Sequence, residues 1–251
     1  MSGSASLTTR LPVDAFAEQF KRETVPLGSH YSYFAALPLE DSQFQQLVQE
    51  PVAALPPALS DVLPKIRLVL VPYLERGNSR SSDAVAFEKP PENRVVVAST
   101  LELGGELFFF LAVKDEDVAD YHYTFYNGLA ALTAVRMREA QRERFNRLLR
   151  EELANEAHGE VEERSWRLKQ QLRRRQTNLL RDTKLQREYF RQAFEDTATL
   201  YLHGLCCDID VETGPRQLPT RYLRKRLELL RQIFPPPEGF ALFPEELGRR
   251  E

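Results

Sequence analysis

The sequence lacks the features that would place the protein in a membrane or an oxidising compartment. Only two of its 251 residues are cysteines, and Cys206 and Cys207 are neighbours, which cannot easily close an ordinary disulfide with each other. No stretch reaches the roughly 18 consecutive apolar residues that a membrane-spanning helix needs, and residues 1–11 lack the apolar centre of a secretory signal. We therefore expect a cytoplasmic protein that has no membrane partner.

Several signatures of catalytic and cofactor-binding sites are also missing. The sequence contains no GxGxxG, no GxxxxGK followed by Ser or Thr, no HExxH and no GxSxG. Nucleotide-binding loops, zincins and serine hydrolases therefore lack their main sequence support. The sequence resembles no family through such motifs, and it identifies no cofactor.

Proline is absent from residues 92–214, although the chain contains 16 prolines. Because proline breaks helix interiors, its absence permits very long helices over this block. The dipeptide His158-Gly159 stands near the middle of the block, flanked by residues with high helix propensity. We predict a long antiparallel helical hairpin whose tip lies near residues 158–159. One continuous helix is the alternative, since an isolated glycine costs only about 1 kcal/mol.

A trial pairing of the two legs supports an antiparallel, coiled-coil-like arm. When the numbers of facing residues sum to about 317, apolar side chains meet across a narrow seam. The facing pairs are Leu149 with Leu168, Phe145 with Leu172, and Met137 with Leu180.

Strand signals are concentrated before this block. β-Branched and aromatic residues dominate four segments, at residues 65–74, 84–88, 94–99 and 106–113. Gly104-Gly105 and residues 90–93 lie where tight connections are needed, which favours antiparallel neighbours in a small meander sheet. Phe108, Phe109 and Phe110 follow one another, so their strand should be covered on both faces. The predicted fold class is α+β, a small antiparallel sheet packed with helices plus the long helical hairpin.

This interpretation divides the chain into four parts. Residues 1–12 form a disordered N-terminus, and residues 13–115 form an α+β body with short helices and antiparallel strands. Residues 116–205 form the helical hairpin, and residues 206–251 form a C-terminal helix and a tail that docks on the body. The final helix is expected over residues 221–234, where Leu223, Leu227 and Leu230 share one face.

Charges are segregated along the chain, although the formal net charge is only −3. Residues 136–187 hold 15 basic and 9 acidic side chains, whereas residues 92–135 hold 2 basic and 7 acidic side chains. Such asymmetry bears on partners rather than on the fold. The arm is therefore predicted to be basic away from its acidic base.

The reactive side chains of the sequence gather at the predicted base of the hairpin. His122, Glu195 and His203 are the candidate catalytic residues, because imidazole near carboxylates can act as a general acid or base. The candidate metal ligands are Asp120, Glu195, His203, Cys207 and Asp208. Zinc requires more ligands than His203 and Cys207 supply. A helix end that buries small cysteines, and a hydrogen-bonded core histidine at position 122, are the plainer interpretations.

Two features of the predicted arm suggest a binding partner. Arg173, Arg174 and Arg175 could contact phosphates, although glutamates on the other leg could pair with them instead. Trp166 is a lone tryptophan near the tip, where it could anchor a partner. The leading hypothesis is a non-enzymatic interaction or adaptor protein that uses the charged arm to bind another macromolecule, chiefly a protein, or a second copy of itself. The alternatives are an enzyme with a polar, metal-dependent site at the base of the hairpin and an arm that binds RNA or DNA.

Overall fold

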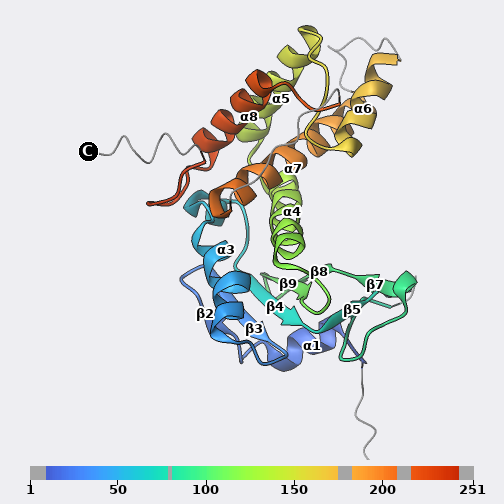
Figure 1. The fold of residues 1–251 in the computed structure, drawn as a ribbon, viewed down its shortest axis with the longest axis vertical. Helices are drawn as coiled ribbons and strands as arrows, with labels where there is room; N and C mark the ends of the chain where they lie inside the picture. The colour runs from blue at the N-terminus through green and yellow to red at the C-terminus, as the bar shows by residue number, and fades with distance from the viewer. Residues whose placement is uncertain (1–9, 79–80, 175–182, 208–215, 243–251) are drawn as a thin grey trace, which may run out of the picture. The chain divides into compact units, whose positions relative to one another are not determined.

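The computed structural model describes residues 10–78, 81–174, 183–207 and 216–242, which belong to two compact units (Figure 1). The first unit takes its residues from Met1–Val52 and Pro64–Phe125, and the second takes them from Ala53–Leu63 and Tyr126–Glu251. Strands and short helices build the first unit, and the longer helices belong to the second. The predicted α+β class is confirmed.

Two sheets organise the first unit. The larger sheet has the strand order β2-β3-β4-β9-β8, and the smaller one has the order β1-β6-β5-β7. The strands of the larger sheet are β2 (Val25–Pro26), β3 (Tyr31–Ala35), β4 (Ile66–Val71), β8 (Ala98–Leu103) and β9 (Glu106–Ala112). Those of the smaller sheet are β1 (Arg10–Pro12), β5 (Tyr73–Glu75), β6 (Ala84–Ala86) and β7 (Val95–Val96).

The larger sheet is mixed, which corrects the expectation of a purely antiparallel meander. Strand β4 pairs in parallel with both β3 and β9, with Val69 beside Phe34 and Phe110. Five of the six residues of β4 are buried, as befits a central strand covered on both faces. The successive phenylalanines 108–110 are likewise buried, as predicted.

One expected hairpin is present. Strands β8 and β9 pair antiparallel, with Leu103 opposite Glu106. Gly104 and Gly105 between them have φ angles of 61° and 79°. Two successive residues of positive φ are what a tight turn between twisted strands requires, and glycine adopts them without steric cost.

Short helices cover the strands of the first unit. Helix α1 (Val13–Phe20) packs Phe16 against Phe110 and against Phe34, with ring centroids 6.1 and 6.0 Å apart. Tyr33 precedes Phe34 on β3, so its side chain points to the opposite face of the sheet. There it contacts Phe44 of α2 (Asp41–Phe44). The chain continues from α2 through a π-helical segment, Gln45–Gln49, into α3 (Glu50–Ala53), and a 3-10 turn, Glu92–Arg94, precedes β7.

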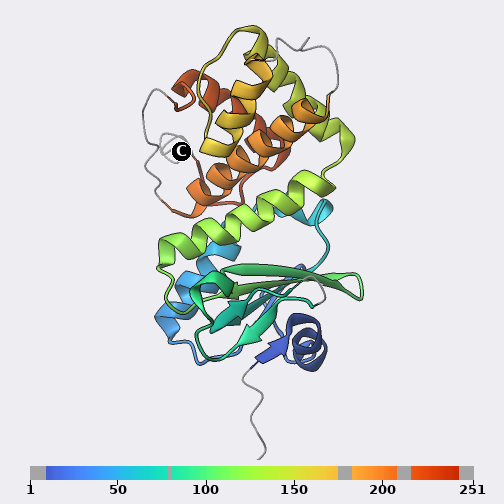
Figure 2. The same ribbon diagram turned by 90° about the vertical axis from the view of Figure 1, so that its right-hand side faces the viewer.

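The second unit is helical (Figure 2). It contains the 3-10 segment η2 (Pro57–Asp61), the later part of α4 (Val118–Arg136), α5 (Glu139–Ala154), α6 (Glu163–Arg174), α7 (Lys184–Cys206) and α8 (Thr220–Ile233). Helix α8 confirms the predicted final helix. No helix within the described residues combines the length and the apolar character needed to cross a lipid bilayer.

The predicted helical hairpin is confirmed in part. Its two legs meet where α4 contacts α7, with Tyr126 stacked on His203 and Asn127 bonded to Thr199. The legs are not continuous, however, because α4 ends at Arg136 and α5 begins at Glu139. Neither proline nor glycine marks this break. The backbone N–H of Arg138 instead donates to Gln141 Oε1 at 3.1 Å, which stabilises the new helix start.

The trial pairing of the legs is not the arrangement observed beyond this break. Helix α6 packs along α7 rather than along α5 (Figure 2). Phe145 of α5 stacks edge-on against Phe194 of α7, at 5.2 Å between ring centroids. Leu180, which the trial pairing placed opposite Met137, lies outside the described residues.

The chain turns at Gly159, close to the predicted tip. Gly159 has a φ of 72°, and a Cβ atom at this position would lie 2.0 Å from the carbonyl oxygen of Gln217. Glu160 forms a parallel bridge with Gln217, in which its N–H donates to Arg216 O and its carbonyl accepts from Leu218 N. Glycine is therefore required by the backbone angle and by the close approach of a second segment.

Candidate binding pocket

A pocket of about 550 Å³ opens in the second unit where α4 ends and α5 lies against α7. This volume is within the range of typical small-ligand sites. The residues that line it combine an apolar floor with a charged rim. The floor consists of Ala134, Met137, Phe145, Phe190 and Phe194, all buried, and exposed Val135 stands beside it. The rim consists of Glu139, Arg142, Glu143, Asn146, Arg150, Arg187 and Arg191.

Helical spacing along α7 explains why apolar floor residues and charged rim residues lie next to each other. Phe190 and Phe194 are four residues apart on α7, so they form one row along the helix. Arg187 and Arg191 have the same spacing and form a neighbouring row. The phenylalanines enter the core, and the arginines remain exposed beside them.

The rim carries an excess of positive charge. It holds four arginines and two glutamates, a net charge of +2. Arg142 pairs with Glu139 at 2.7 Å, and Arg150 pairs with Glu143 at 2.8 Å. Exposed ion pairs of this kind contribute about 0.2–1 kcal/mol, so an incoming carboxylate can replace an internal one at little cost.

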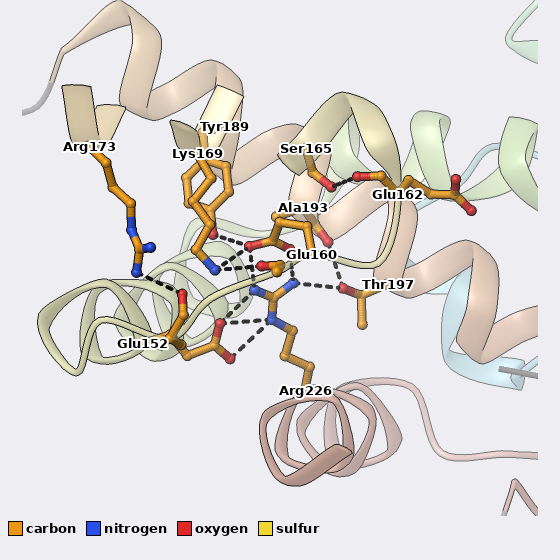
Figure 3. A network of polar contacts seen from close by, with 12 residues as sticks. Glu152, Glu160, Glu162, Ser165, Lys169, Arg173, Tyr189, Ala193, Thr197 and Arg226 are labelled. Atoms are coloured by element: carbon orange, nitrogen blue, oxygen red, sulfur yellow. Dashed lines mark hydrogen bonds and ion pairs between the residues drawn. The ribbon is translucent and has the colours of Figure 1, made fainter. Parts of the chain in front are cut away.

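A buried ion cluster holds the surrounding helices together (Figure 3). The guanidinium of Arg226, on α8, lies between the carboxylates of Glu152 on α5 and Glu160 in the turn before α6. Lys169 Nζ donates to Glu160 Oε1 at 2.8 Å, and the Tyr189 hydroxyl donates to the same oxygen at 2.5 Å. All four helices from α5 to α8 are thus joined through fully buried side chains.

Electrostatics keeps the cluster charged. Burial alone would raise the pKa of Glu160, but the charges and hydrogen bonds of Arg226 and Lys169 outweigh it and hold the pKa at about 2. Burial lowers the pKa of Lys169, although Glu160 opposes this effect. Because each charge is partnered and the cluster is enclosed, we interpret it as a structural element rather than a reaction centre.

His122 fits its plainer interpretation as a core histidine. It lies in the first unit, is 4% exposed, and its Nε2 is 2.7 Å from Gln46 O. The neighbouring Tyr121 hydroxyl donates to Leu47 O, also at 2.7 Å. Since a carbonyl oxygen only accepts, Nε2 of His122 donates in this contact, and only Nδ1 is left with a lone pair that could serve a base or a metal ligand.

The other candidate catalytic and metal-binding residues do not line the pocket, although Glu195 contacts Arg191 on its rim. His203 is half-buried against Tyr126, and a ring nitrogen of His203 lies within 4.8 Å of the Cys207 sulfur. Cys207 follows the last residue of α7 and has extended backbone angles. Glu195 pairs with Arg191 at 3.2 Å, and burial raises its pKa despite that arginine.

The two remaining candidate metal ligands are Asp120 and Asp208. Asp120 is exposed in the first turn of α4, in the first unit. Asp208 lies outside the described residues. The metal-site prediction thus stays a prediction.

The candidate partner-binding residues are partly engaged within the chain. Trp166 is half-buried, and the Arg216 guanidinium lies 4.9 Å from its ring centroid, beside a small pocket of about 180 Å³. Arg173 donates to Ala157 O at 3.0 Å. Arg174 is exposed, and Arg175 lies outside the described residues.

Sequence reasoning missed the pocket and the buried cluster. The pocket had a recognisable signal in the paired rows of phenylalanine and arginine on α7. The buried cluster also had a recognisable signal. Arg226 falls among Leu223, Leu227 and Leu230 on the apolar stripe of α8, where an arginine requires buried partners. The identity of those partners, Glu152 and Glu160, depended on tertiary contacts that the sequence does not display.

Comparison of the chain with protein-family models, with curated proteins and with solved structures finds no match.

Proposed function

We propose that the chain is a non-enzymatic interaction protein whose helical unit binds an acidic protein segment at the arginine-rimmed pocket. The observation that carries this proposal is the pairing of an apolar floor with a net positive rim. Apolar contact supplies binding free energy, and guanidinium groups select carboxylates through bidentate hydrogen bonds. Val135, which is 61% exposed at the edge of the pocket, offers further apolar surface to a partner.

The two alternative functions have weaker support. None of His122, Glu195 and His203 lines the pocket, so an enzyme would need a different site. A nucleic-acid-binding surface built on Arg173–Arg175 would have to compete with the bond from Arg173 to Ala157. A cytoplasmic location is part of our proposal, because Cys206 and Cys207 are reduced cysteines, a state that a reducing compartment preserves.

Site-specific photo-cross-linking tests the proposed function. A benzophenone side chain placed at position 135 should form a discrete cross-link to a protein in cells, and the cross-linked peptide should contain carboxylates around a bulky apolar residue. The same group at Phe87, which is 45% exposed in the first unit, is the matched control. Reversing Arg187 and Arg191 to glutamate should abolish the cross-link from position 135. Absence of a cross-link at 135, or its persistence in the reversed variant, would contradict the proposal.

A further inference from the structure

We propose that the occupant of the pocket is the acidic start of α4 in a second copy of the chain, so that the protein associates head to tail. This inference rests on the proposed function and names the partner. The segment concerned comprises residues 115–123, which we call the acidic segment. It lies in the first unit, whereas the pocket belongs to the second.

The acidic segment has the chemistry that the pocket requires. Asp117 and Asp120 are exposed carboxylates, and Val118 and Tyr123 are exposed to 39% and 43%. These two side chains are among the few large apolar groups that the described residues leave so accessible. Asp120 and Tyr123 are three residues apart in a helix, so a carboxylate and an aromatic ring share one face.

Within the acidic segment, Glu116 is the carboxylate most affected by its neighbours of like charge. Burial raises the pKa of Glu116, and the neighbouring Asp120, Asp117 and Asp115 raise it further. Asp115 has a partner in Lys89, at 2.7 Å. Arginines brought by another molecule would relieve this repulsion, and Arg187 and Arg191 stand exposed beside the apolar floor of the pocket.

Charge along the whole sequence is divided in the same way. Residues 92–135 carry 7 acidic and 2 basic side chains, and residues 136–187 carry 15 basic and 9 acidic ones. Opposite charges on two parts of one chain favour contact between unlike surfaces of two copies. In a head-to-tail assembly that does not close into a ring, one pocket and one acidic segment at its ends stay unoccupied. Further copies can bind there, so the size of the assembly increases with protein concentration.

Complementation between two variants tests the inference. One variant carries Glu116→Lys and Asp120→Lys, which disable the acidic segment, and the other carries Arg187→Glu and Arg191→Glu, which disable the pocket. Analytical ultracentrifugation at low salt should show concentration-dependent association of the unaltered chain, weakened at least about tenfold by each pair of substitutions. An equimolar mixture of the two variants should recover a one-to-one complex, because each variant retains the surface that the other has lost.

Control variants separate a local effect from a general effect of charge. Arg147→Glu with Arg224→Glu changes net charge as the pocket variant does, but at exposed arginines outside the pocket. Glu88→Lys with Glu92→Lys serves the same purpose for the acidic segment. Circular-dichroism melting curves should show that all these variants fold. Both control pairs should associate like the unaltered chain.

Three results would overturn head-to-tail association. They are a monomeric unaltered chain at every concentration, a mixture of the two variants that stays monomeric, and equal weakening by the control variants. None of these would remove the proposed function if position 135 still cross-links to a different acidic protein. Loss of that cross-link as well would remove both.

Discussion

Arg226 shows how one side chain can organise several helices. Its guanidinium binds Glu152 on α5 and Glu160 before α6, although Arg226 itself belongs to α8. A buried charge is costly when unpaired, so these contacts also exclude arrangements in which either carboxylate is displaced. Helical periodicity predicts that position 226 is buried, but only the folded chain reveals what balances its charge.

Acid should weaken the second unit through Glu160. Its pKa is about 2 in the folded protein and 4.5 ordinarily, so the unfolded chain binds the proton more readily. The stabilisation is complete above pH 4.5 and is lost as pH falls towards 2. Glu160→Gln should therefore lower stability at neutral pH and flatten its dependence on acid, as measured by urea unfolding.

The exposed Glu163→Gln is the matched control for this experiment, and it should leave the acid profile unchanged. An acid profile of Glu160→Gln as steep as that of the unaltered chain would show that other carboxylates dominate. Asp196 contributes to the pH dependence of stability in the opposite direction. Burial raises its pKa, so its contribution is lost as pH rises.

Gly159 should tolerate no side chain. Gly159→Ala would place a methyl group 2.0 Å from Gln217 O and would also strain a φ of 72°. We expect a loss of more than about 2 kcal/mol in unfolding free energy, since the left-handed conformation alone costs alanine about 1–2 kcal/mol. The fluorescence of Trp166, the only tryptophan in the sequence, reports unfolding of this unit.

Gly239→Ala is the control for the steric part of that loss. Gly239 has a φ of 87°, but its surroundings are open. Gly239→Ala should therefore lower the unfolding free energy only by the cost of placing alanine at a positive φ angle. Equal losses at positions 159 and 239 would show that the approach of Gln217 is not rigid.

At the scale of elements, the π-helical segment Gln45–Gln49 provides acceptors for α4. Pro51 has no N–H, so it cannot donate to Leu47 O in an α-helical pattern or to Gln46 O in a π-helical pattern. These are the two carbonyls that Tyr121 and His122 contact. A proline thus directs two backbone acceptors towards side chains from a distant part of the first unit.

A double-mutant cycle can measure this exchange of donors. Tyr121→Phe should cost about 1–3 kcal/mol, because it leaves the buried Leu47 carbonyl without its donor. In the background of Pro51→Ala, the restored N–H can satisfy that carbonyl, so the same change should cost less. Chemical denaturation of the four proteins gives both penalties. Equal penalties in the two backgrounds would mean that position 51 does not control the acceptor.

The sequence predicted elements better than it predicted their partners. The absence of proline from 92–214 indicated long helices, and Gly104-Gly105 indicated the β8–β9 hairpin. The parallel pairing of β4 with β9 joins residues about forty positions apart, and no local pattern encodes it. The break after Arg136 was also missed, since it depends on Gln141 bonding to Arg138 rather than on a helix-breaking residue.

At the scale of the molecule, the second unit is built from two separate stretches of chain. Residues 53–63 belong to it, although residues on both sides of them belong to the first unit. Leu59, which is 1% exposed, packs in a region lined by Ala130, Phe194, Leu202 and Leu230. A division of the chain into consecutive domains could not have anticipated this insertion.

Leu59 should be as important to the second unit as a residue of its long helices. Leu59→Ala should lower unfolding free energy by about 2–5 kcal/mol, the range for a leucine removed from a packed core. Trp166 fluorescence during urea unfolding provides the measurement. Val62→Ala, at a half-buried position of the same stretch, should cost less. A negligible effect of Leu59→Ala would show that the stretch is only loosely packed.

The insertion also constrains the order of events during synthesis. Leu59 leaves the ribosome roughly 170 residues ahead of Leu230, with which it shares a core. At translation speeds of about 5–20 residues per second, this leucine waits on the order of ten seconds or more for its neighbours. The apolar stretch 53–63 therefore lacks its packing partners until translation is nearly finished. During this period it offers chaperones a binding site that is buried in the folded protein.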